Sequence, residues 1–332
     1  MPELPEVETV ARDLRPLVTG STIVDARTLW ARTLRDKTPE AFATGVAGHR
    51  IEGVSRRGKQ LVVSLDGGAF LTIHLKMTGQ LFVVRQDTRE DPYVRLVLEL
   101  EDGREIRFRD IRKFGRVGLY GETGDDPFAR TGPEPLADSF TLAAFRRLIR
   151  RRKGRLKSLL LDQSFIAGVG NIYADEALWA ARLHPLRTAR TLRPADERRL
   201  WRELRRILAE AVIRRGSSID DYTAPDGDGE MQEHLQVYQR AGEPCPRCGR
   251  PIRRIVVGGR ATHFCSWCQR LPAADRAGGG AAAILRTMAT PERRGRRWTE
   301  LDGEGSLGST RAERTRKAAA TRRAAARASA GG

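Results

Sequence analysis

Four cysteines constrain the fold of this chain more than any other feature. They form two C-x-x-C pairs, CPRC at 245–248 and CSWC at 265–268, and sixteen residues separate the pairs. This spacing is typical of a zinc site in which each pair binds the metal from one turn. The intervening stretch, GRPIRRIVVGGRATHF, predicts a β-hairpin with a Gly-Gly turn. We therefore expect one structural Zn2+, closed to water, with the ligands Cys245, Cys248, Cys265 and Cys268.

A disulfide framework is the other use of such cysteines, and the rest of the sequence does not favour it. The N-terminus lacks the basic stretch and apolar run of a signal peptide. The sequence has no run of about 18 apolar residues, the length that a membrane span needs. We expect a cytoplasmic, nucleoid-associated protein that does not contact a membrane.

The charge of the chain favours a polyanion as partner. Lys and Arg outnumber Asp and Glu by 60 to 42, which gives a formal net charge of +18. Nucleic acid is the favoured partner, because each neutralised phosphate releases a counterion. A basic protein with no specific partner is the alternative on charge alone.

The hydrophobic pattern changes along the chain. Residues 5–17 predict a helix, because Pro5 suits its first turn and Val7, Val10 and Leu14 share one face. Short strand-like runs then continue to about residue 120, separated by Gly and Asp turns, and predict an antiparallel sandwich. After about residue 140, apolar residues recur every three or four positions and predict helices.

These patterns predict an α+β protein in four parts. Residues 1–135 form an N-terminal antiparallel β-sandwich flanked by helices, and 136–234 form a helical domain. Residues 235–270 form the zinc-finger hairpin. Residues 271–332 are rich in Ala, Gly and Arg, and we expect a disordered basic tail, because they have few apolar residues spaced to form a core. The tail either adds non-specific DNA contacts or is solvated without a role.

Six segments, in order, carry a resemblance to a known family. They are MPELPEVETV at the start, HLKMTGQL at 74–81, DIRKFGRVG at 110–118, GPEPL at 132–136, GVGNIYADE at 168–176, and the two C-x-x-C pairs. Together they resemble the bacterial formamidopyrimidine-DNA glycosylases over residues 2 to about 270. The resemblance implies a helix-two-turn-helix fold for the helical domain and a monomer that acts on damaged double-stranded DNA.

The resemblance also implies a reaction. The family removes oxidised purines through an N-terminal proline Schiff base and then nicks the strand by β,δ-elimination, so it is both glycosylase and AP lyase. The opening PELPE is similar to this branch. The alternatives are the sibling branch for oxidised pyrimidines, endonuclease VIII, and a non-catalytic DNA-binding protein.

Catalytic roles follow from the same resemblance. Removal of Met1 would expose the secondary amine of the nucleophile, and a neighbouring carboxylate would donate a proton. A second carboxylate would position these groups, a lysine would assist β-elimination, and an arginine at the hairpin tip would assist δ-elimination. The matching residues are, in that order, Pro2, Glu3, Glu6, Lys59 and Arg260. For Arg260 a solvated turn arginine is the alternative.

DNA-contacting residues also match the family. Met77, Arg112 and Phe114 would fill the space left when the target nucleotide is flipped out. On periodicity alone, Met77 and Phe114 would instead be core residues of strands. The backbone-binding positions are Lys153, Lys157 and Asn171.

The glycine-rich turn at 168–170 precedes a predicted helix and has two interpretations. Its backbone amides could bind a DNA phosphate at the helix N-terminus, or Asn171 could cap an ordinary helix. The sequence alone leaves both open.

Two positions depart from the family pattern. Asp91 stands where the family commonly has a histidine, and an acid is unsuited to bind phosphate. In the stretch 226–240, which matches the loop that caps the flipped base, Glu230 and Met231 replace aromatic residues. The preference among oxidised purines is therefore left open.

Overall fold

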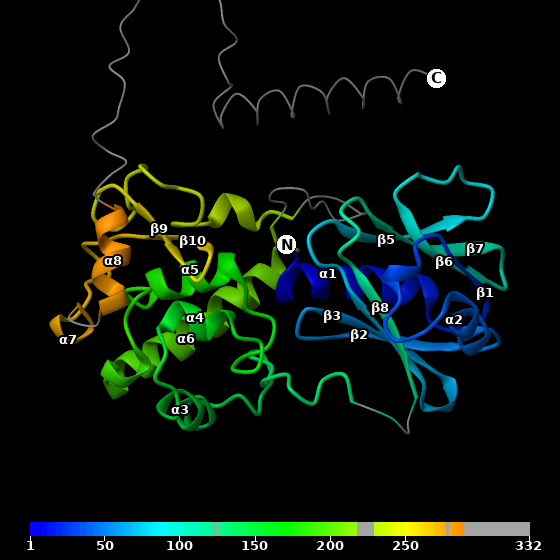
Figure 1. The fold of residues 1–332 in the computed structure, drawn as a ribbon, viewed down its shortest axis with the longest axis horizontal. Helices are drawn as coiled ribbons and strands as arrows, with labels where there is room; N and C mark the ends of the chain where they lie inside the picture. The colour runs from blue at the N-terminus through cyan, green and yellow to red at the C-terminus, as the bar shows by residue number, and fades with distance from the viewer. Residues whose placement is uncertain (122–123, 125, 218–228, 277–278, 289–332) are drawn as a thin grey trace, which may run out of the picture. The chain divides into compact units, whose positions relative to one another are not determined.

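The computed structural model describes residues 1–121, 124, 126–217, 229–276 and 279–288. Met1–Ala289 form one compact unit, whose elements run from blue to orange in Figure 1. The unit confirms the expected α+β class, with two four-stranded antiparallel sheets, a helical region and a two-stranded hairpin. Within these residues, every helix is too short or too polar to cross a membrane.

Helix α1 (Leu4–Val18) exceeds the predicted range by one residue at each end. Pro5 lies in the first turn, where the missing N–H breaks no helical hydrogen bond. The carboxylate of Glu6 accepts a hydrogen bond from the backbone N–H of Glu3 at 2.8 Å, so the helix start is closed by its own first turn. The apolar face is buried in the core of the sandwich through Val7, Val10, Ala11 and Leu14.

The sandwich consists of two antiparallel sheets with the strand orders β1-β6-β7-β5 and β2-β3-β4-β8. Side chains from both sheets and from α1 share one apolar core, as the sequence predicted. The strands are β1 (Ile23–Thr28), β2 (Ile51–Arg57), β3 (Gln60–Leu65), β4 (Phe70–His74), β5 (Gly79–Arg85), β6 (Val94–Leu100), β7 (Arg104–Asp110) and β8 (Arg116–Tyr120). Short 3-10 turns occupy Ala31–Thr33 and Asp66–Gly68.

Sequence analysis missed helix α2 (Pro39–Val46). Its local signals are present, because the hydroxyl of Thr38 accepts a hydrogen bond from the backbone N–H of Ala41 and a proline opens the first turn. Only two of its side chains, Phe42 and Val46, are buried. Two apolar residues are too few for a periodic pattern, which explains the omission.

The helical region consists of α3 (Leu142–Arg150), α4 (Leu156–Leu161), α5 (Asn171–Ala180) and α6 (Pro194–Ile213), with 3-10 turns at Ala189–Thr191 and Met231–His234. Helix α6 follows the predicted spacing of three or four residues, and its apolar stripe is buried through Leu200, Leu204, Ile207, Leu208 and Ala211. Helix α5 differs from the others because most of its length is buried, polar side chains included. It is the central element of the helical region and, as shown below, positions the site.

The cysteine module contains the predicted hairpin, β9 (Arg253–Val257) and β10 (Arg260–Phe264), joined by a turn at Gly258 and Gly259. Both glycines have positive φ, which this tight turn requires. The expectation of disorder from residue 271 is wrong for its first part. Helices α7 (Ala273–Arg276) and α8 (Gly279–Met288) follow, and α8 packs on the hairpin through Ala281, Ile284 and Leu285. The rest of the predicted tail, 289–332, lies outside the described residues.

Candidate active site

The carboxylate of Glu3 lies at the N-terminus of α5. It accepts hydrogen bonds from the backbone N–H groups of Gly170 at 2.7 Å and Ile172 at 2.8 Å. The side chain is buried, and a Cβ atom at position 170 would clash with it. The structure therefore gives the glycine-rich turn a third role. Its amides hold a catalytic candidate from α1, and Gly170 rather than Asn171 is the N-cap.

Glu6 fixes the same N-terminal segment from a second side. Its carboxylate accepts the hydroxyl of Tyr173 at 2.6 Å and the backbone N–H of Ser217 at 2.8 Å, in addition to the N–H of Glu3. All of these groups are buried. The arrangement supports the positioning role expected for Glu6, because its oxygens are taken up by structural hydrogen bonds.

Lys59 occupies the turn between β2 and β3 and is buried beside these carboxylates. Burial lowers the pKa of Lys59, although Glu3 and Glu6 oppose the shift, and Arg260 lowers it further. Burial raises the pKa of Glu3, against the opposing charge of Lys59. The pKa values of an acid and an amine thus move toward one another in one buried site, as expected where protons are transferred.

Pro2 and Arg260 complete the group of predicted catalytic residues. Pro2 is buried, whereas Met1 before it is exposed by 37% and accessible for removal. Arg260 is exposed at the first position of β10, and its charge acts on Lys59. Residues from α1, the β2–β3 turn and the cysteine hairpin therefore converge, although up to 258 positions separate them in the sequence.

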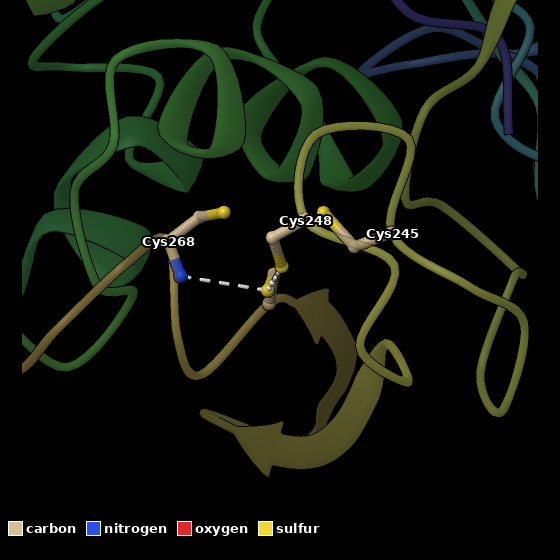
Figure 2. A group of neighbouring side chains, drawn as sticks. Cys245, Cys248 and Cys268 are labelled. Atoms are coloured by element: carbon tan, nitrogen blue, oxygen red, sulfur yellow. Dashed lines mark hydrogen bonds between the residues drawn. The ribbon is translucent and has the colours of Figure 1, made fainter.

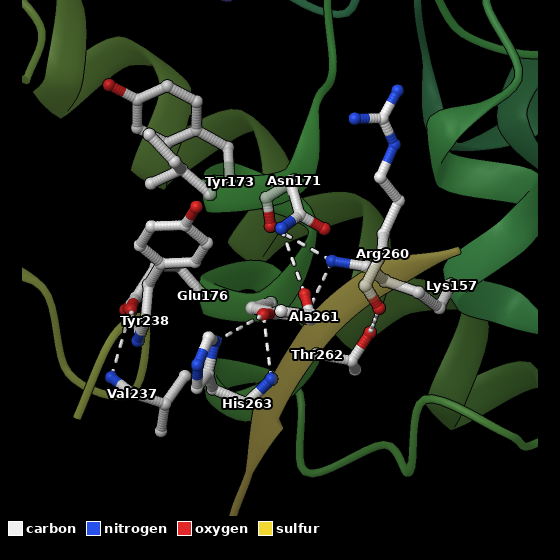
Figure 3. A network of polar contacts seen from close by, with 12 residues as sticks. Lys157, Asn171, Tyr173, Glu176, Val237, Tyr238, Arg260, Ala261, Thr262 and His263 are labelled. Carbon is white, nitrogen blue, oxygen red and sulfur yellow. Dashed lines mark hydrogen bonds and ion pairs between the residues drawn. The ribbon is translucent and has the colours of Figure 1, made fainter. Parts of the chain in front are cut away.

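A buried network connects α5 to the hairpin (Figure 3). The side-chain amide of Asn171 donates to the carbonyl of Ala261 at 2.9 Å, and Asp175 accepts the backbone N–H of His263 at 2.8 Å. The side chain of Arg260 extends away from this network (Figure 3). Helix α5 therefore binds Glu3 at its first turn and holds strand β10, which carries Arg260, along its side.

The structure corrects the expectation that Lys157 binds the DNA backbone. Its side chain is completely buried, and its ammonium donates to Asp175 at 2.7 Å and to the carbonyl of Asn171 at 2.9 Å. A group with these partners and no exposed surface does not face a DNA phosphate. Lys153, by contrast, is exposed, as a backbone contact requires.

The three candidates for filling the DNA lie on loops and not in strands. Met77 lies in the turn between β4 and β5, and Arg112 and Phe114 lie between β7 and β8. Phe114 is exposed by 48%, with the guanidinium of Arg112 at 5.1 Å from its ring centre. The alternative that Met77 and Phe114 are core residues of strands is wrong. The two loops are joined, because the backbone N–H of Arg112 donates to Thr78 at 3.1 Å.

The four cysteines lie close enough to share one metal ion, and Figure 2 labels three of them, Cys245, Cys248 and Cys268. Their sulfur atoms are all within 4.8 Å of one another. Four thiolates from two turns fit tetrahedral Zn2+ and leave no coordination position open. The cluster lies at the other end of the hairpin from Arg260, so the metal has a structural role and does not touch the reacting atoms.

The two departures from the family pattern are partly explained. The carboxylate of Asp91 pairs with Arg109 at 2.8 Å, so its charge is already matched. Met231 is buried in the helical core, while Glu230 is exposed. Residues 226–228 of the expected capping loop lie outside the described residues.

Sequence reasoning missed several buried or half-buried polar residues that build the site. Tyr173, Asp175 and His263 supply the contacts described above, and Glu134 holds the turn before Lys59. The only available signals were acids within otherwise apolar surroundings, such as Glu134 in GPEPL. The hydrogen-bond partners of these residues are far away in the sequence, so a single sequence does not reveal which residues bind each other.

Three family models match the chain. They are the formamidopyrimidine-DNA glycosylase N-terminal domain at residues 1–117, the formamidopyrimidine-DNA glycosylase H2TH domain at 131–223, and the zinc finger found in FPG and IleRS at 242–271. The sandwich, the helical region and the cysteine hairpin are thus the three domains of a zinc-finger DNA glycosylase.

Individual relatives agree with this class. The formamidopyrimidine-DNA glycosylase of Chloroflexus aurantiacus is 49% identical over 272 residues, which cover 81% of this chain and 98% of the relative. The solved MutM (FPG) protein of Thermus thermophilus is 45% identical, with a TM-score of 0.73 over 82% of this chain and 100% of the other. A Lactococcus lactis FPG mutant in complex with Fapy-dG-containing DNA is 37% identical, with a TM-score of 0.76 over 81% and 100%. The chain belongs to the formamidopyrimidine-DNA glycosylase family.

Proposed function

We propose that this protein removes oxidised purines, 8-oxoguanine and formamidopyrimidines, from double-stranded DNA and then cuts the strand at the abasic site. The observation that carries the proposal is the buried Glu3 beside Pro2, held by the amides of α5 and within the electrostatic reach of Lys59. A buried acid next to a nucleophile and an amine suits proton transfer at a sugar carbon.

The first chemical step requires the free amine of Pro2. After Met1 is removed, the nitrogen attacks C1′ of the damaged nucleotide, and the glycosidic bond breaks with its electron pair on the base. Glu3 supplies the proton that the leaving base or the opening sugar ring takes up. The C1′–O4′ bond then breaks with its electron pair on O4′, and the proton lost by the amine goes to whichever of the base and O4′ did not receive the proton of Glu3. An iminium ion now joins Pro2 to the opened sugar.

The iminium ion then acts as an electron sink for strand cutting. Loss of a C2′ proton expels the 3′ phosphate, and a second elimination expels the 5′ phosphate. We assign proton transfer in the first elimination to Lys59 and contact with the departing phosphate to Arg260. The lowered pKa of Lys59 supports this assignment, because it increases the fraction of free amine near neutral pH.

The DNA must open for this chemistry. The exposed ring of Phe114 suits insertion into the base stack, Met77 suits contact with the vacated space, and Arg112 can donate hydrogen bonds to the orphaned base. Lys153 suits contact with the DNA backbone. The side-chain oxygen of Asn171 is buried and has no hydrogen-bond partner among the described residues, and its side-chain amide donates to the carbonyl of Ala261. We therefore assign Asn171 mainly to holding the hairpin.

The finer biological setting is also a proposal. We infer a monomer that works on cytoplasmic, nucleoid-associated DNA, with the basic segment after Met288 adding non-specific contacts. The net charge of +18 supports this inference. Deletion after Met288 is expected to reduce the salt dependence of binding to undamaged DNA. An unchanged salt slope would show that the segment after Met288 does not contact DNA.

Borohydride trapping tests the reaction. Met1-processed protein is mixed with duplex DNA that contains 8-oxoguanine opposite cytosine, and the iminium ion is reduced to a stable adduct. We expect an adduct with the wild type and a much weaker one with Pro2→Gly. No adduct would reject the mechanism and favour a non-catalytic DNA-binding protein. Preferential trapping on thymine glycol would instead favour the pyrimidine-specific branch.

A further inference from the structure

An arginine-lined cavity lies at the far end of α5 from Glu3. Its volume is about 950 Å³, and it is bordered by the end of α5, the start of α6, the cysteine cluster and the segment that enters α7. Arg182 follows the C-terminal end of α5, whereas Glu3 binds the N-terminal end. Because α5 has 10 residues, about 15 Å separate its two ends. The cavity is therefore distinct from the catalytic site.

Cations greatly outnumber anions in this cavity. Arg182, Arg187, Arg193 and Arg199 come from the helical region, and Arg247, Arg270 and Arg276 come from the cysteine module and the residues after it. Among the described residues, the lining contains one carboxylate, Asp196, and three of the arginines already share it. A zinc tetrathiolate adds two negative charges. Positive charge remains in excess after both are counted.

Some of these cations lack an anionic partner. Arg182 and Arg270 form no ion pair within the part of the chain that the structure describes, and both are exposed. Among the residues that the structure describes, none accepts a hydrogen bond from the buried Nε of Arg199. An anion that enters the cavity would stabilise these guanidinium groups by accepting their hydrogen bonds.

Trp267 adds a stacking surface at the cavity wall. The indole is exposed by 48%, with the guanidinium of Arg250 at 3.5 Å and that of Arg270 at 4.2 Å from its centre. Aromatic rings and guanidinium planes are the groups on which unpaired bases stack.

We infer that this cavity binds the phosphodiester backbone of a single-stranded nucleic-acid segment, separately from the catalytic groove. Every cation in the lining is arginine, whose planar fork binds phosphate and carboxylate oxygens alike in pairs. One feature favours nucleic acid over an acidic peptide. The exposed indole and the guanidinium groups that lie over it offer a base contact that an acidic peptide would not use. The inference does not depend on the proposed reaction.

The test separates the cavity from the catalytic groove. Full-length protein is first saturated with an unlabelled duplex that carries an uncleavable abasic-site analogue. Binding of a short fluorescein-labelled oligothymidylate is then measured by anisotropy between about 50 and 200 mM salt. The variant is Arg182→Ala with Arg270→Ala, because both side chains are exposed and form no ion pair within the described residues. The matched control is Arg12→Ala with Arg85→Ala, two exposed arginines of the sandwich.

We expect the cavity variant to bind the oligothymidylate at least about tenfold more weakly than the control pair. Its salt slope should fall by about 1.4, since each contact to a single strand contributes about 0.7. Zinc content, melting temperature and 8-oxoguanine excision should match those of the control. Equal binding by the two variants would overturn the inference. Displacement of the oligothymidylate by an oligoglutamate at equal charge would overturn it in favour of an acidic protein partner.

Discussion

The backbone N–H of Gly58 donates a hydrogen bond to Oε1 of Glu134 at 2.6 Å, and this contact ties the turn that carries Lys59 to the segment entering the helical region. Arg56 and Arg57 bind the same carboxylate at 2.7 and 2.8 Å. Burial alone would raise the pKa of Glu134, but these guanidinium groups and the amide lower it below its usual value. The position of Lys59 therefore depends on an ionised carboxylate that is not itself at the reaction centre.

Glu134→Gln is expected to lower the free energy of unfolding by about 2–3 kcal/mol at neutral pH, because a partly buried charge network loses its shared acceptor. The native pKa of Glu134 is depressed, so its stabilisation is complete above the ordinary value of 4.5 and disappears as the pH falls through the native pKa. Urea unfolding at several pH values should show the wild type and the variant converging in acid. The exposed control Glu52→Gln should show no such convergence.

Sequence and structure agree where local pattern decides the outcome. The cysteine cluster, the amphipathic helix α6 and the short strands of the sandwich were predicted correctly, because each depends on residues close together in the chain. The failures have a common physical cause. Glu134 and Asp175 bind groups from other elements of the fold, and Lys157 is buried against Asp175. These contacts join residues that are distant in the sequence, so they could not be predicted before the fold was known. Helix α8 was missed because its three apolar residues are shielded from water only by packing against the hairpin.

Glu3→Gln should separate base removal from strand cutting. Burial raises the pKa of Glu3, so the acid keeps its proton to higher pH than a free carboxyl group and can donate it. We expect base excision from 8-oxoguanine duplex to fall by about 100-fold or more, the range of general acid catalysis. Cutting of a preformed abasic site should be retained to within about tenfold, because there is no base to protonate.

The pH dependence of excision tests whether Glu3 donates the proton. In the wild type, the single-turnover excision rate should decline as the pH rises through the raised pKa of Glu3, because the donor is lost. The Gln variant should lack this limb and keep only the rise due to deprotonation of the amine, near pH 7.7–8.0 for a free α-amino group. Identical profiles in the two proteins would contradict the donor role.

His263→Phe should change the products of strand cutting more than base removal. The imidazole lies 3.3 Å from the carboxylate of Asp175 and three positions after Arg260, so its loss loosens the strand that presents the guanidinium. Lys157 keeps its partner in this variant, which protects the core. Denaturing gels should show a higher ratio of β- to δ-elimination product, by about threefold to tenfold, at nearly unchanged excision. An unchanged ratio in a folded, zinc-loaded variant would argue against positioning through His263.

Cys248→Ser should remove the metal and, with it, the hairpin geometry. The wild type is expected to bind about one Zn2+ per chain, since four thiolates within 4.8 Å form one closed site. The variant should lose zinc, melt at a lower temperature and cut abasic DNA poorly, because Arg260 is no longer held. Elemental analysis and thermal melting check this. Ser266→Ala, between two ligands, is the matched control and should retain the metal.

Phe114→Ala should impair catalysis on duplex DNA without destabilising the protein. The ring is exposed by 48%, so its removal should change the free energy of unfolding by no more than about 0.5 kcal/mol. Phe108→Ala, at 1% exposure in the same region, should cost about 3–5 kcal/mol and serves as the buried comparison. If Phe114 fills the space left by the flipped nucleotide, excision from a duplex should fall by about tenfold or more, because the opened state loses a few kcal/mol of support. On the same lesion in single-stranded DNA there is no stack to open, so the variant should match the wild type. Equal losses on both substrates would mean that Phe114 acts on binding in general and not on base flipping.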